Sequence, residues 1–210
     1  MAGNTKEERD TCIGYFPDLE FDGNFIVNSD PNFFYNCIGF AIGYEDIWVA
    51  PSQRRSIPWF WWPDTVPFDD QPESLVDTFH YFGFEVCPDD DPEEGYDKVA
   101  LYSKDGHWKH AARIIGENLY HSKLGEAYDI LHRGGDVLDR ATKAEDSYGV
   151  PFLFMRRKIE DKTVLAIKRP PYGYMKWAGN TFLYMAPSPL RTQTIQRIIN
   201  GGYAMSINPK

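Results

Sequence analysis

The hydrophobic period of the chain changes at Gly83, and this change constrains the fold more than any other feature. Before it, the apolar residues of 73–82, such as Leu75 and Phe79, recur at helical spacing, and glycine is common just after a helix ends. After it, apolar residues alternate with a period near 2, which is typical of strands. The order predicts a helical part followed by a sheet, and therefore an α+β fold.

A meander of antiparallel strands is expected after Gly83. Strands are predicted at 84–87, 96–103, 108–115, 119–124 and 151–157. The turn formers Lys104-Asp105-Gly106 and Gly116-Glu117-Asn118 separate the central three strands. An acidic run at 89–94 predicts a solvated loop, and no clear pattern is seen between 125 and 150.

A short helix is expected to begin at Asn36 and to continue to about Ile47. Cap and turn formers occupy 28–32, and Ile38 and Ala41 then recur at helical spacing. Prolines and tryptophans interrupt every pattern over 51–72, which predicts an ordered aromatic loop. Cys37 is thus expected in the first turn of this helix.

The chain divides into three parts. Residues 1–34 show no sustained periodicity and predict an irregular lead-in that covers part of the core. Residues 35–157 hold the predicted helices and sheet. Residues 158–210, with a Pro170-Pro171 break, are expected to form a C-terminal extension docked on that core.

Charge and cysteine content limit the classes of partner. The 210 residues carry a net charge of -9, which repels phosphate backbones and anionic lipid, so we expect neither a nucleic-acid nor a membrane partner. Neither a secretory signal nor a membrane-spanning apolar run is present, and a cytoplasmic location is expected. The three cysteines are an odd number without a Cys-x-x-Cys pair, which indicates a reduced compartment.

Cys37 and His110 are the best candidates for chemistry. Unpaired backbone N–H groups in the first turn of a helix favour a thiolate, which makes Cys37 a candidate nucleophile. A nucleophile needs a base, and His110 lies on the middle strand of the predicted meander. Each residue alone is more often a buried structural residue, so the order of helix-borne cysteine and strand-borne histidine is what favours catalysis.

These motifs resemble the NlpC-type and CHAP-type branch of papain-fold cysteine peptidases and amidases. Asn36-Cys37-Ile38-Gly39-Phe40-Ala41 is similar to its helix signature, and His110-Ala111-Ala112-Arg113-Ile114-Ile115-Gly116 to its strand signature. The chain also resembles a family of bacterial and fungal domains that share further motifs. In this sequence those are Asn36 to Ile38, Lys98 to Tyr102, His110 to Arg113, Ser122 to Gly125, and Asp129 to His132.

The resemblance implies a papain-like fold and a cysteine hydrolase or acyl transferase. Cys37 would attack a carbonyl and His110 would accept its proton, with a small molecule or a peptide as substrate and no cofactor or metal. A third residue that orients the imidazole is expected, and His121, Ser122 and Asp129 compete for this role. Ser122 has the better position and Asp129 the better charge.

Four further residues are candidates for substrate binding. Asn36 can donate to an oxyanion or cap the helix, and Lys123 can lower a thiolate pKa, hold a carboxylate or end a strand in solvent. Trp61 and Trp62 can wall a cleft or pack the core, and packing is slightly favoured.

Two alternatives stand beside the enzyme hypothesis. A non-catalytic binding module with the same fold would use the acidic surface and the aromatic loop as an interface. A metal site from His107, His110 and His121 is disfavoured, because residues three apart on a strand point to opposite faces.

Overall fold

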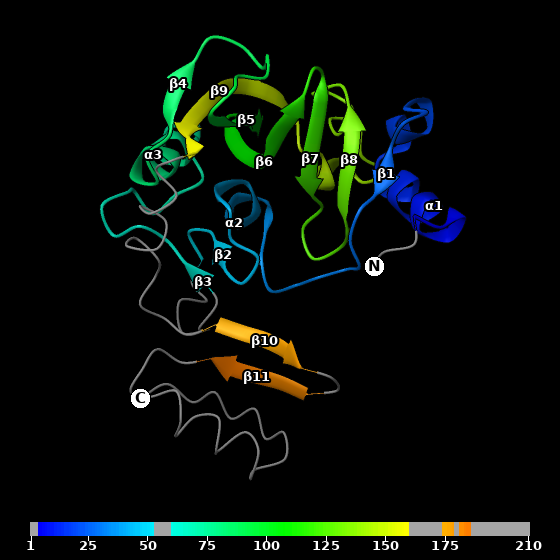
Figure 1. Ribbon diagram of the computed structural model, residues 1–210, viewed down its shortest axis with the longest axis horizontal. Helices are drawn as coiled ribbons and strands as arrows, with labels where there is room; N and C mark the ends of the chain where they lie inside the picture. The colour runs from blue at the N-terminus through cyan, green and yellow to red at the C-terminus, as the bar shows by residue number, and fades with distance from the viewer. Residues whose placement is uncertain (1–3, 53–59, 160–173, 179–180, 186–210) are drawn as a thin grey trace.

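The centre of the protein is a seven-stranded sheet in which all neighbouring strands are antiparallel. The computed structural model describes residues 4–52, 60–159, 174–178 and 181–185. The strand order is β1 (Ile26–Val27), β8 (Asp129–Arg133), β7 (Leu119–Lys123), β6 (His107–Gly116), β5 (Tyr96–Lys104), β9 (Val150–Lys158) and β4 (Glu85–Cys87) (Figure 1). The α+β class predicted from the sequence is therefore confirmed.

Short helices and two small strand pairs complete the described part. The helices are α1 (Lys6–Tyr15), α2 (Cys37–Ile42) and α3 (Pro72–Tyr81), with the 3-10 turns η1 (Pro17–Phe21) and η2 (Ala144–Asp146). β2 (Trp48–Val49) pairs in parallel with β3 (Phe60–Trp61), and β10 (Tyr174–Ala178) pairs antiparallel with β11 (Thr181–Met185). Among the described residues, no helix is long and apolar enough to cross a membrane.

The meander after Gly83 follows the sequence closely. All five strands predicted between 84 and 157 are present, with ends that shift by at most one residue. Asp105 and Gly106 turn β5 into β6 with φ of 54° and 80°, and Asn118 turns β6 into β7 with φ of 47°. These residues tolerate positive φ, which a two-residue hairpin turn requires.

Two expectations were wrong because the local pattern was weak. Residues 1–34 were expected to be irregular, yet they contain α1, capped by Thr5 and Glu8, and β1, which pairs with β8 at the sheet edge. The stretch after Gly125 showed no clear pattern, yet it contains β8. The strands β1 and β8 are short and depend on tertiary pairing, whereas α1 has ten residues and begins with a local capping box, but its apolar residues show no helical periodicity.

α2 ends earlier than expected, and contacts with the sheet fix its position. Gly43 adopts φ of 116° and ends the helix, so it does not reach Ile47. A Cβ on Gly39 would lie 2.3 Å from the carbonyl oxygen of Ile47, so only glycine permits this approach. Arg113 donates to the carbonyl of Phe40 at 2.8 Å from Nε, and Arg157 donates to that of Ile42 at 3.0 Å.

The two faces of the sheet are covered by different segments. α2 and α3 pack on one face, which we call the helix face, with buried side chains such as Leu101 and Ala111. Tyr102 and Ala112, their neighbours in sequence, belong to a cluster on the opposite face. At the β1–β8 end, α1 and η1 lie beside the sheet (Figure 1) and share an apolar cluster with Ile130.

The C-terminal part was expected to form an extension docked on residues 35–157. Most of 160–210 lies outside the described residues, apart from the backbone of the β10–β11 hairpin.

Candidate active site

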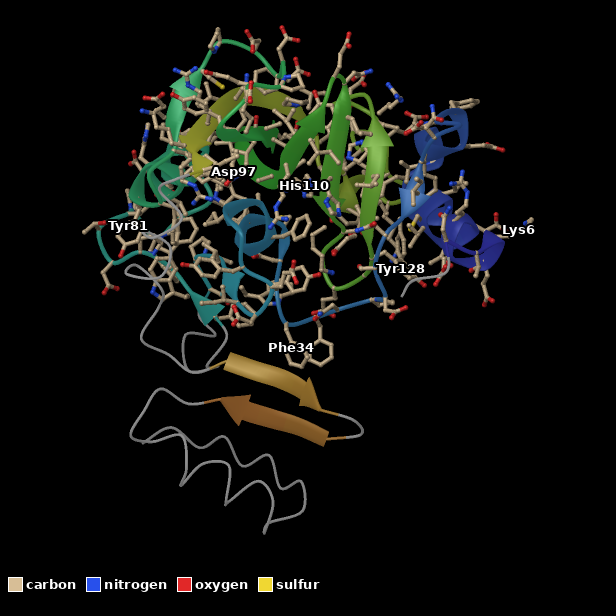
Figure 2. All side chains as sticks on the ribbon, in the orientation of Figure 1. Lys6, Phe34, Tyr81, Asp97, His110 and Tyr128 are labelled. Carbon is tan, nitrogen blue, oxygen red and sulfur yellow. The ribbon has the colours of Figure 1, made fainter. Side chains whose placement is uncertain are left out.

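His110 lies in the middle of the sheet and is fully buried (Figure 2). Its Nε2 is 3.0 Å from the hydroxyl oxygen of Ser122, and the same oxygen is 2.8 Å from Nε2 of His132. All three side chains are 0% exposed. Nδ1 of His110 and Nδ1 of His132 have no hydrogen-bond partner within the described part of the chain. Two buried histidines are therefore joined through one hydroxyl.

The single proton of Ser122 restricts the protonation of the two rings. A hydroxyl that donates to one Nε2 accepts from the other, so one histidine carries its proton on Nε2 and the other does not. When Ser122 donates to His132, it accepts from Nε2–H of His110, and Nδ1 of His110 then has a free lone pair. In that arrangement His110 has the form of a base.

Burial keeps both histidines neutral. It lowers the pKa of His110 well below its usual value, and the nearby charge of His132 lowers it further. Burial also lowers the pKa of His132 to about 4. An imidazolium at either position therefore needs a negatively charged group beside it, and such a group reaches the ring only during a reaction or after a rearrangement.

Cys37 is the first residue of α2 and faces β6. Burial raises the pKa of its thiol to about 11, although the backbone amide of Ala111 and the charge of Lys123 act in the opposite direction. The sequence argument expected a stabilised thiolate here. Desolvation is the larger effect, because α2 has only six residues and the side chain is 7% exposed.

Alternation along β6 places His110 and Cys37 on different faces of the sheet. Ala111 packs with Cys37 on the helix face, whereas the His110 ring contacts Tyr102 of the opposite cluster edge-on. Consistent with this, the hydrogen bonds of the described residues include none between Cys37 and His110. The pairing of β6 with β7 ends at Ala112 and Ser122, so the β7 ladder stops short of His110, whereas β5 still pairs with His110 through Tyr102.

Tyr148 packs on His110 at this end of the sheet. Its ring stacks on the imidazole with centroids 4.3 Å apart and an angle of 11°. Burial raises the pKa of its phenol, and the charge of Cys37 raises it further. A bulge at Lys109 adds to the irregularity, since Ser103 pairs with Trp108 and Tyr102 with His110.

The three candidates for orienting His110 lie in different places. Ser122 is hydrogen-bonded to it, as described above. Asp129 accepts a bond from the Tyr35 hydroxyl at 2.9 Å on the helix face, and burial raises its pKa. His121 has its ring edge-on to Phe40, with centroids 4.7 Å apart, and its Nε2 is 3.4 Å from Asn28. Of the three, only Ser122 reaches His110.

Lys123 does not end its strand in solvent. The side chain is 0% exposed, and Nζ donates to the carbonyl of Ala127 at 2.6 Å and lies 5.0 Å from the centre of the Tyr35 ring. Burial lowers its pKa to about 8, while Asp129 and Cys37 act in the opposite direction. A buried amine with a pKa near neutrality therefore accompanies Cys37.

The other proposed binding residues have structural contacts. Asn36 caps α2 by accepting from the amide of Gly39 at 3.0 Å, and it exchanges two hydrogen bonds with Val49. Its side chain is therefore not a free oxyanion donor. Trp61 packs on Tyr81 and Phe82, and Trp62 stacks on Trp108. Both are core residues, with 9% and 3% exposure.

The histidines considered for a metal do not converge. His107 pairs with Asp70 at 3.0 Å, whereas His110 and His121 have the partners given above. Within the described residues, no group of three His, Cys, Asp or Glu side chains has the arrangement to hold a metal ion.

Comparison with known proteins assigns a family without an activity. A family model described as a domain of unknown function (DUF7689) matches residues 26–156, which is more than half of the chain. The chain belongs to this family. Neither the search of the curated proteins nor that of the solved structures found a match to the chain. The DUF7689 match includes Cys37, His110, Ser122 and His132, but not the C-terminal part.

The sequence analysis assigned no role to two residues of the candidate site. His132 belongs to the Asp129 to His132 motif, but no role was assigned to it because β8 was not predicted. Alternation from Ile130 would have placed it on the face of Ser122. Tyr148 lies just outside the DUF7689 sheet, after η2, and no local pattern indicates its contact with His110.

Proposed function

We propose that the DUF7689 domain is a papain-like cysteine hydrolase or acyl transferase that acts on an amide or related acyl bond through Cys37 and His110. One observation supports this most. Nε2 of His110 is held by Ser122, while its Nδ1 is buried and has no hydrogen-bond partner among the described residues. An imidazole that is fixed at one nitrogen and unpaired at the other is suited to accept a proton.

The reaction uses these groups in two steps. The thiol proton of Cys37 passes to Nδ1 of His110, and the sulfur attacks the substrate carbonyl carbon. The bond to the leaving nitrogen breaks, the proton on Nδ1 moves to that nitrogen, and the acyl group stays on sulfur. Water then releases it as an acid, or an acceptor amine takes it. Lys123 stabilises the thiolate through its charge.

This chemistry requires Nδ1 to come within hydrogen-bond reach of the sulfur. In this structure the two side chains lie on different faces of the sheet, so the proposal requires the imidazole to turn toward Cys37 when substrate binds. The pairing of β6 with β7 ends at Ala112, and at His110 the strand is held on its other side by β5, through Tyr102.

The experiment is alkylation by iodoacetamide followed peptide by peptide with mass spectrometry from pH 6 to pH 10. Only the thiolate reacts, and a thiol with a pKa of about 11 is roughly one part in 10⁴ ionised at pH 7. If Cys37 and His110 form an ion pair, Cys37 reacts at least about tenfold faster than Cys12 and Cys87 at pH 7. His110→Gln should remove this advantage.

His80→Gln is the matched control, because His80 lies on α3 and contacts the carbonyl of Phe84, away from β6. It should leave the labelling of Cys37 unchanged. Equal and slow labelling of all three thiols, unaffected by His110→Gln, would contradict the proposal. With a substrate in hand, Cys37→Ala should abolish turnover.

A non-catalytic binding module is the second candidate, and one observation favours it. His110 and Ser122 are both 0% exposed, as expected for a polar pair that serves packing alone. The same labelling experiment distinguishes the two, because a structural pair predicts that Cys37 behaves as an ordinary buried thiol with a raised pKa.

A further inference from the structure

Lys123 and Asp129 form a buried pair of opposite charges on the helix face of the sheet. They lie directly opposite one another in the antiparallel pairing of β7 with β8, so their side chains leave the sheet on the same side. Lys123 is 0% exposed and Asp129 is 5% exposed. The pair is therefore held away from water, where charges act strongly on one another.

The two side chains share a neighbour rather than a direct contact. Oδ2 of Asp129 accepts from the Tyr35 hydroxyl at 2.9 Å, and Nζ of Lys123 lies 5.0 Å from the centre of the Tyr35 ring. Within the described part of the chain, neither Lys123 nor Asp129 forms an ion pair, and the buried Oδ1 of Asp129 has no hydrogen-bond partner. The charge of Asp129 is thus not offset by a cation in contact with it.

The protonation of Lys123 depends on this carboxylate. A buried ammonium group is stable only where negative charge lies nearby. Burial lowers the pKa of Lys123 to about 8, and the charge of Asp129 is the largest effect in the opposite direction. Burial raises the pKa of Asp129, whereas the hydrogen bond from Tyr35 and the charge of Lys123 favour its carboxylate.

Cys37 lies on the same face as this pair. α2 packs on β7, and Tyr35 precedes Cys37, the first residue of α2, by two positions. Burial raises the pKa of the thiol, and the charge of Lys123 acts against that rise. His110 lies on the opposite face. Lys123 therefore favours the thiolate of Cys37, and does so only while the amine carries its proton.

We propose that Asp129 is a positioning residue for Cys37 that acts through Lys123: its carboxylate keeps the buried amine charged, and that charge favours the thiolate. The proposal rests on the function proposed above. It adds to that site a buried carboxylate that regulates the nucleophile without touching the substrate.

The other titratable groups on this side of the sheet keep their charge between pH 7 and pH 10. Tyr35 and Tyr148 stay neutral because burial raises the pKa of each phenol. His121 stays neutral because burial lowers its pKa to about 4, and the guanidinium of Arg113 stays charged. Carboxylates are ionised in this range, and those that act on the pair from the surface are Glu45 and Glu126.

The pH profile of iodoacetamide labelling at Cys37 tests the proposal. The slope of the logarithm of the rate against pH should decrease above pH 8, because Lys123 then loses the charge that favours the thiolate. An isolated thiol with a pKa of about 11 would keep one slope up to pH 10.

Asp129→Asn is the decisive variant. Asparagine is nearly isosteric and still accepts from the Tyr35 hydroxyl, so the fold should be retained. The labelling rate of Cys37 at pH 7.5 should fall about fivefold, and the change of slope should move below pH 8. Glu126→Gln is the matched control: it also removes a negative charge that acts on Lys123, but from an exposed position, and should change the rate by less than about twofold.

Lys123→Met distinguishes action through the amine from a structural role of Asp129. It should lower the rate at pH 7.5 about fivefold and remove the change of slope, and Asp129→Asn added to it should cause no further decrease. Titration of the Lys123 side chain by nuclear magnetic resonance measures the protonation directly. Its pKa should be lower in Asp129→Asn than in the unchanged protein.

The outcomes separate the two proposals. An unchanged labelling rate in folded Asp129→Asn, or a Lys123 pKa that this variant does not lower, overturns the role of Asp129. If Lys123→Met folds poorly, these two measurements still decide. Failure of the proposed function appears elsewhere, as a Cys37 labelling profile that His110→Gln does not alter. The coupling through Lys123 can hold in that case, because it involves the face of the sheet opposite to His110.

Discussion

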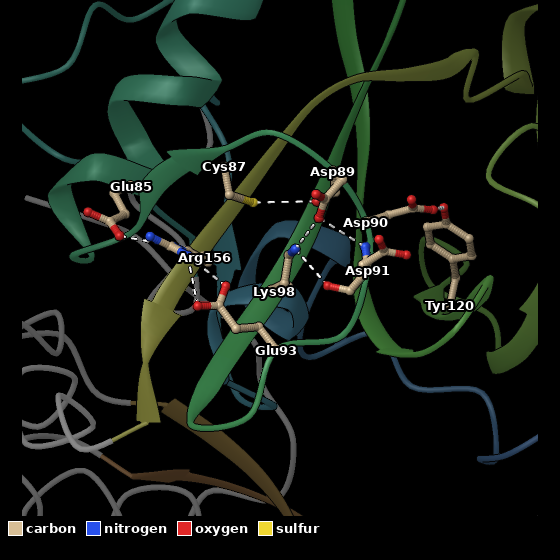
Figure 3. A network of polar contacts seen from close by, with 9 residues as sticks. All are labelled: Glu85, Cys87, Asp89, Asp90, Asp91, Glu93, Lys98, Tyr120 and Arg156. Carbon is tan, nitrogen blue, oxygen red and sulfur yellow. Dashed lines mark hydrogen bonds and ion pairs between the residues drawn. The ribbon is translucent and has the colours of Figure 1, made fainter.

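Two clusters of buried polar side chains lie on the sheet, and they differ in how their hydrogen bonds are satisfied. On the edge near β4, Lys98 is 4% exposed, and its Nζ donates to Asp89 at 2.8 Å and to the carbonyl of Asp91 at 2.7 Å. Figure 3 shows the acidic loop folded around this lysine. At the centre of the sheet, Ser122 joins His110 to His132, and each ring leaves Nδ1 without a partner among the described residues.

The difference supports a stabilising role for the Lys98 cluster and the catalytic role proposed above for the histidine cluster. The Lys98 cluster pairs a cation with exposed carboxylates, so its members are charged, bonded and in reach of water. The histidine cluster is fully buried and neutral, and two of its nitrogens have no partner among the described residues. Buried polar groups without partners cost free energy, and natural proteins retain them mostly at functional sites.

Acidification should have the largest effect on the free energy of unfolding, because it protonates the buried histidines. In the folded protein the pKa of His132 is about 4 and that of His110 is well below 6.5, whereas both are near 6.5 in the unfolded chain. The unfolded state therefore binds more protons below pH 6.5, and stability falls as the pH falls. Between pH 7 and pH 5 the loss from these two rings should be about 4 kcal/mol, by about 2 kcal/mol for each ring. His121, whose pKa burial also lowers to about 4, adds to this loss.

Urea unfolding at pH 7, 6 and 5 measures this loss. His132→Gln should reduce the slope by about a third to a half, since His110 and His121 still contribute, and His80→Gln should leave it unchanged. Asp129 has a raised pKa and acts in the opposite direction, so it does not produce the loss. Stability that is constant from pH 7 to pH 5 would show that the rings are not buried and neutral.

Removal of the bridging hydroxyl should have the next largest effect. Ser122→Ala leaves two buried Nε2 atoms without a partner, at a cost of about 2–3 kcal/mol in the free energy of unfolding at pH 7.5. Ser74→Ala is the control: this buried serine makes one side-chain bond, to Asp69 at 2.6 Å, and should cost about 1 kcal/mol. Equal losses would contradict the bridge.

Lys98→Met should destabilise the protein by about 1–2 kcal/mol, because the carboxylate of Asp89 is half exposed and water replaces the lost partner. The measurement is again urea unfolding. The labelling rate of Cys37 should stay unchanged, which separates this cluster from the candidate site. A large change in that rate would contradict the division of roles drawn here.

Glu85→Gln should have the smallest effect. Arg156 bonds Glu85 at 2.9 Å but also holds Glu93 through two contacts, and Glu85 is largely exposed. The loss should stay below about 0.5 kcal/mol and decrease further in 1 M salt. Paired unfolding curves at low and high salt would detect a larger or salt-independent loss, which would refute the assignment as a surface pair.

The outcome of the sequence analysis differs from element to element. The meander from Phe84 to Arg157 was predictable because each strand alternates and each turn contains residues that tolerate positive φ, such as Gly106 and Asn118. β8 was missed because it depends on pairing with β1 and β7, and α1 was missed because its apolar residues are not periodic, although Thr5 and Glu8 form a local capping box. Ser122 was among the candidates to orient His110, whereas His132 and Tyr148 had no local signal for a role.

The sequence by itself determined the class of the fold, the position of Cys37 at the start of a helix and the strand that carries His110, because periodicity, caps and turns are local. Only the tertiary structure decided which groups meet. Strand register joins Ser122 to two histidines, alternation turns Ala111 rather than His110 toward Cys37, and a loop after η2 brings Tyr148 onto the imidazole. Desolvation is also tertiary: the same thiol that a helix start favours as a thiolate has a pKa of about 11 once neighbouring segments exclude water.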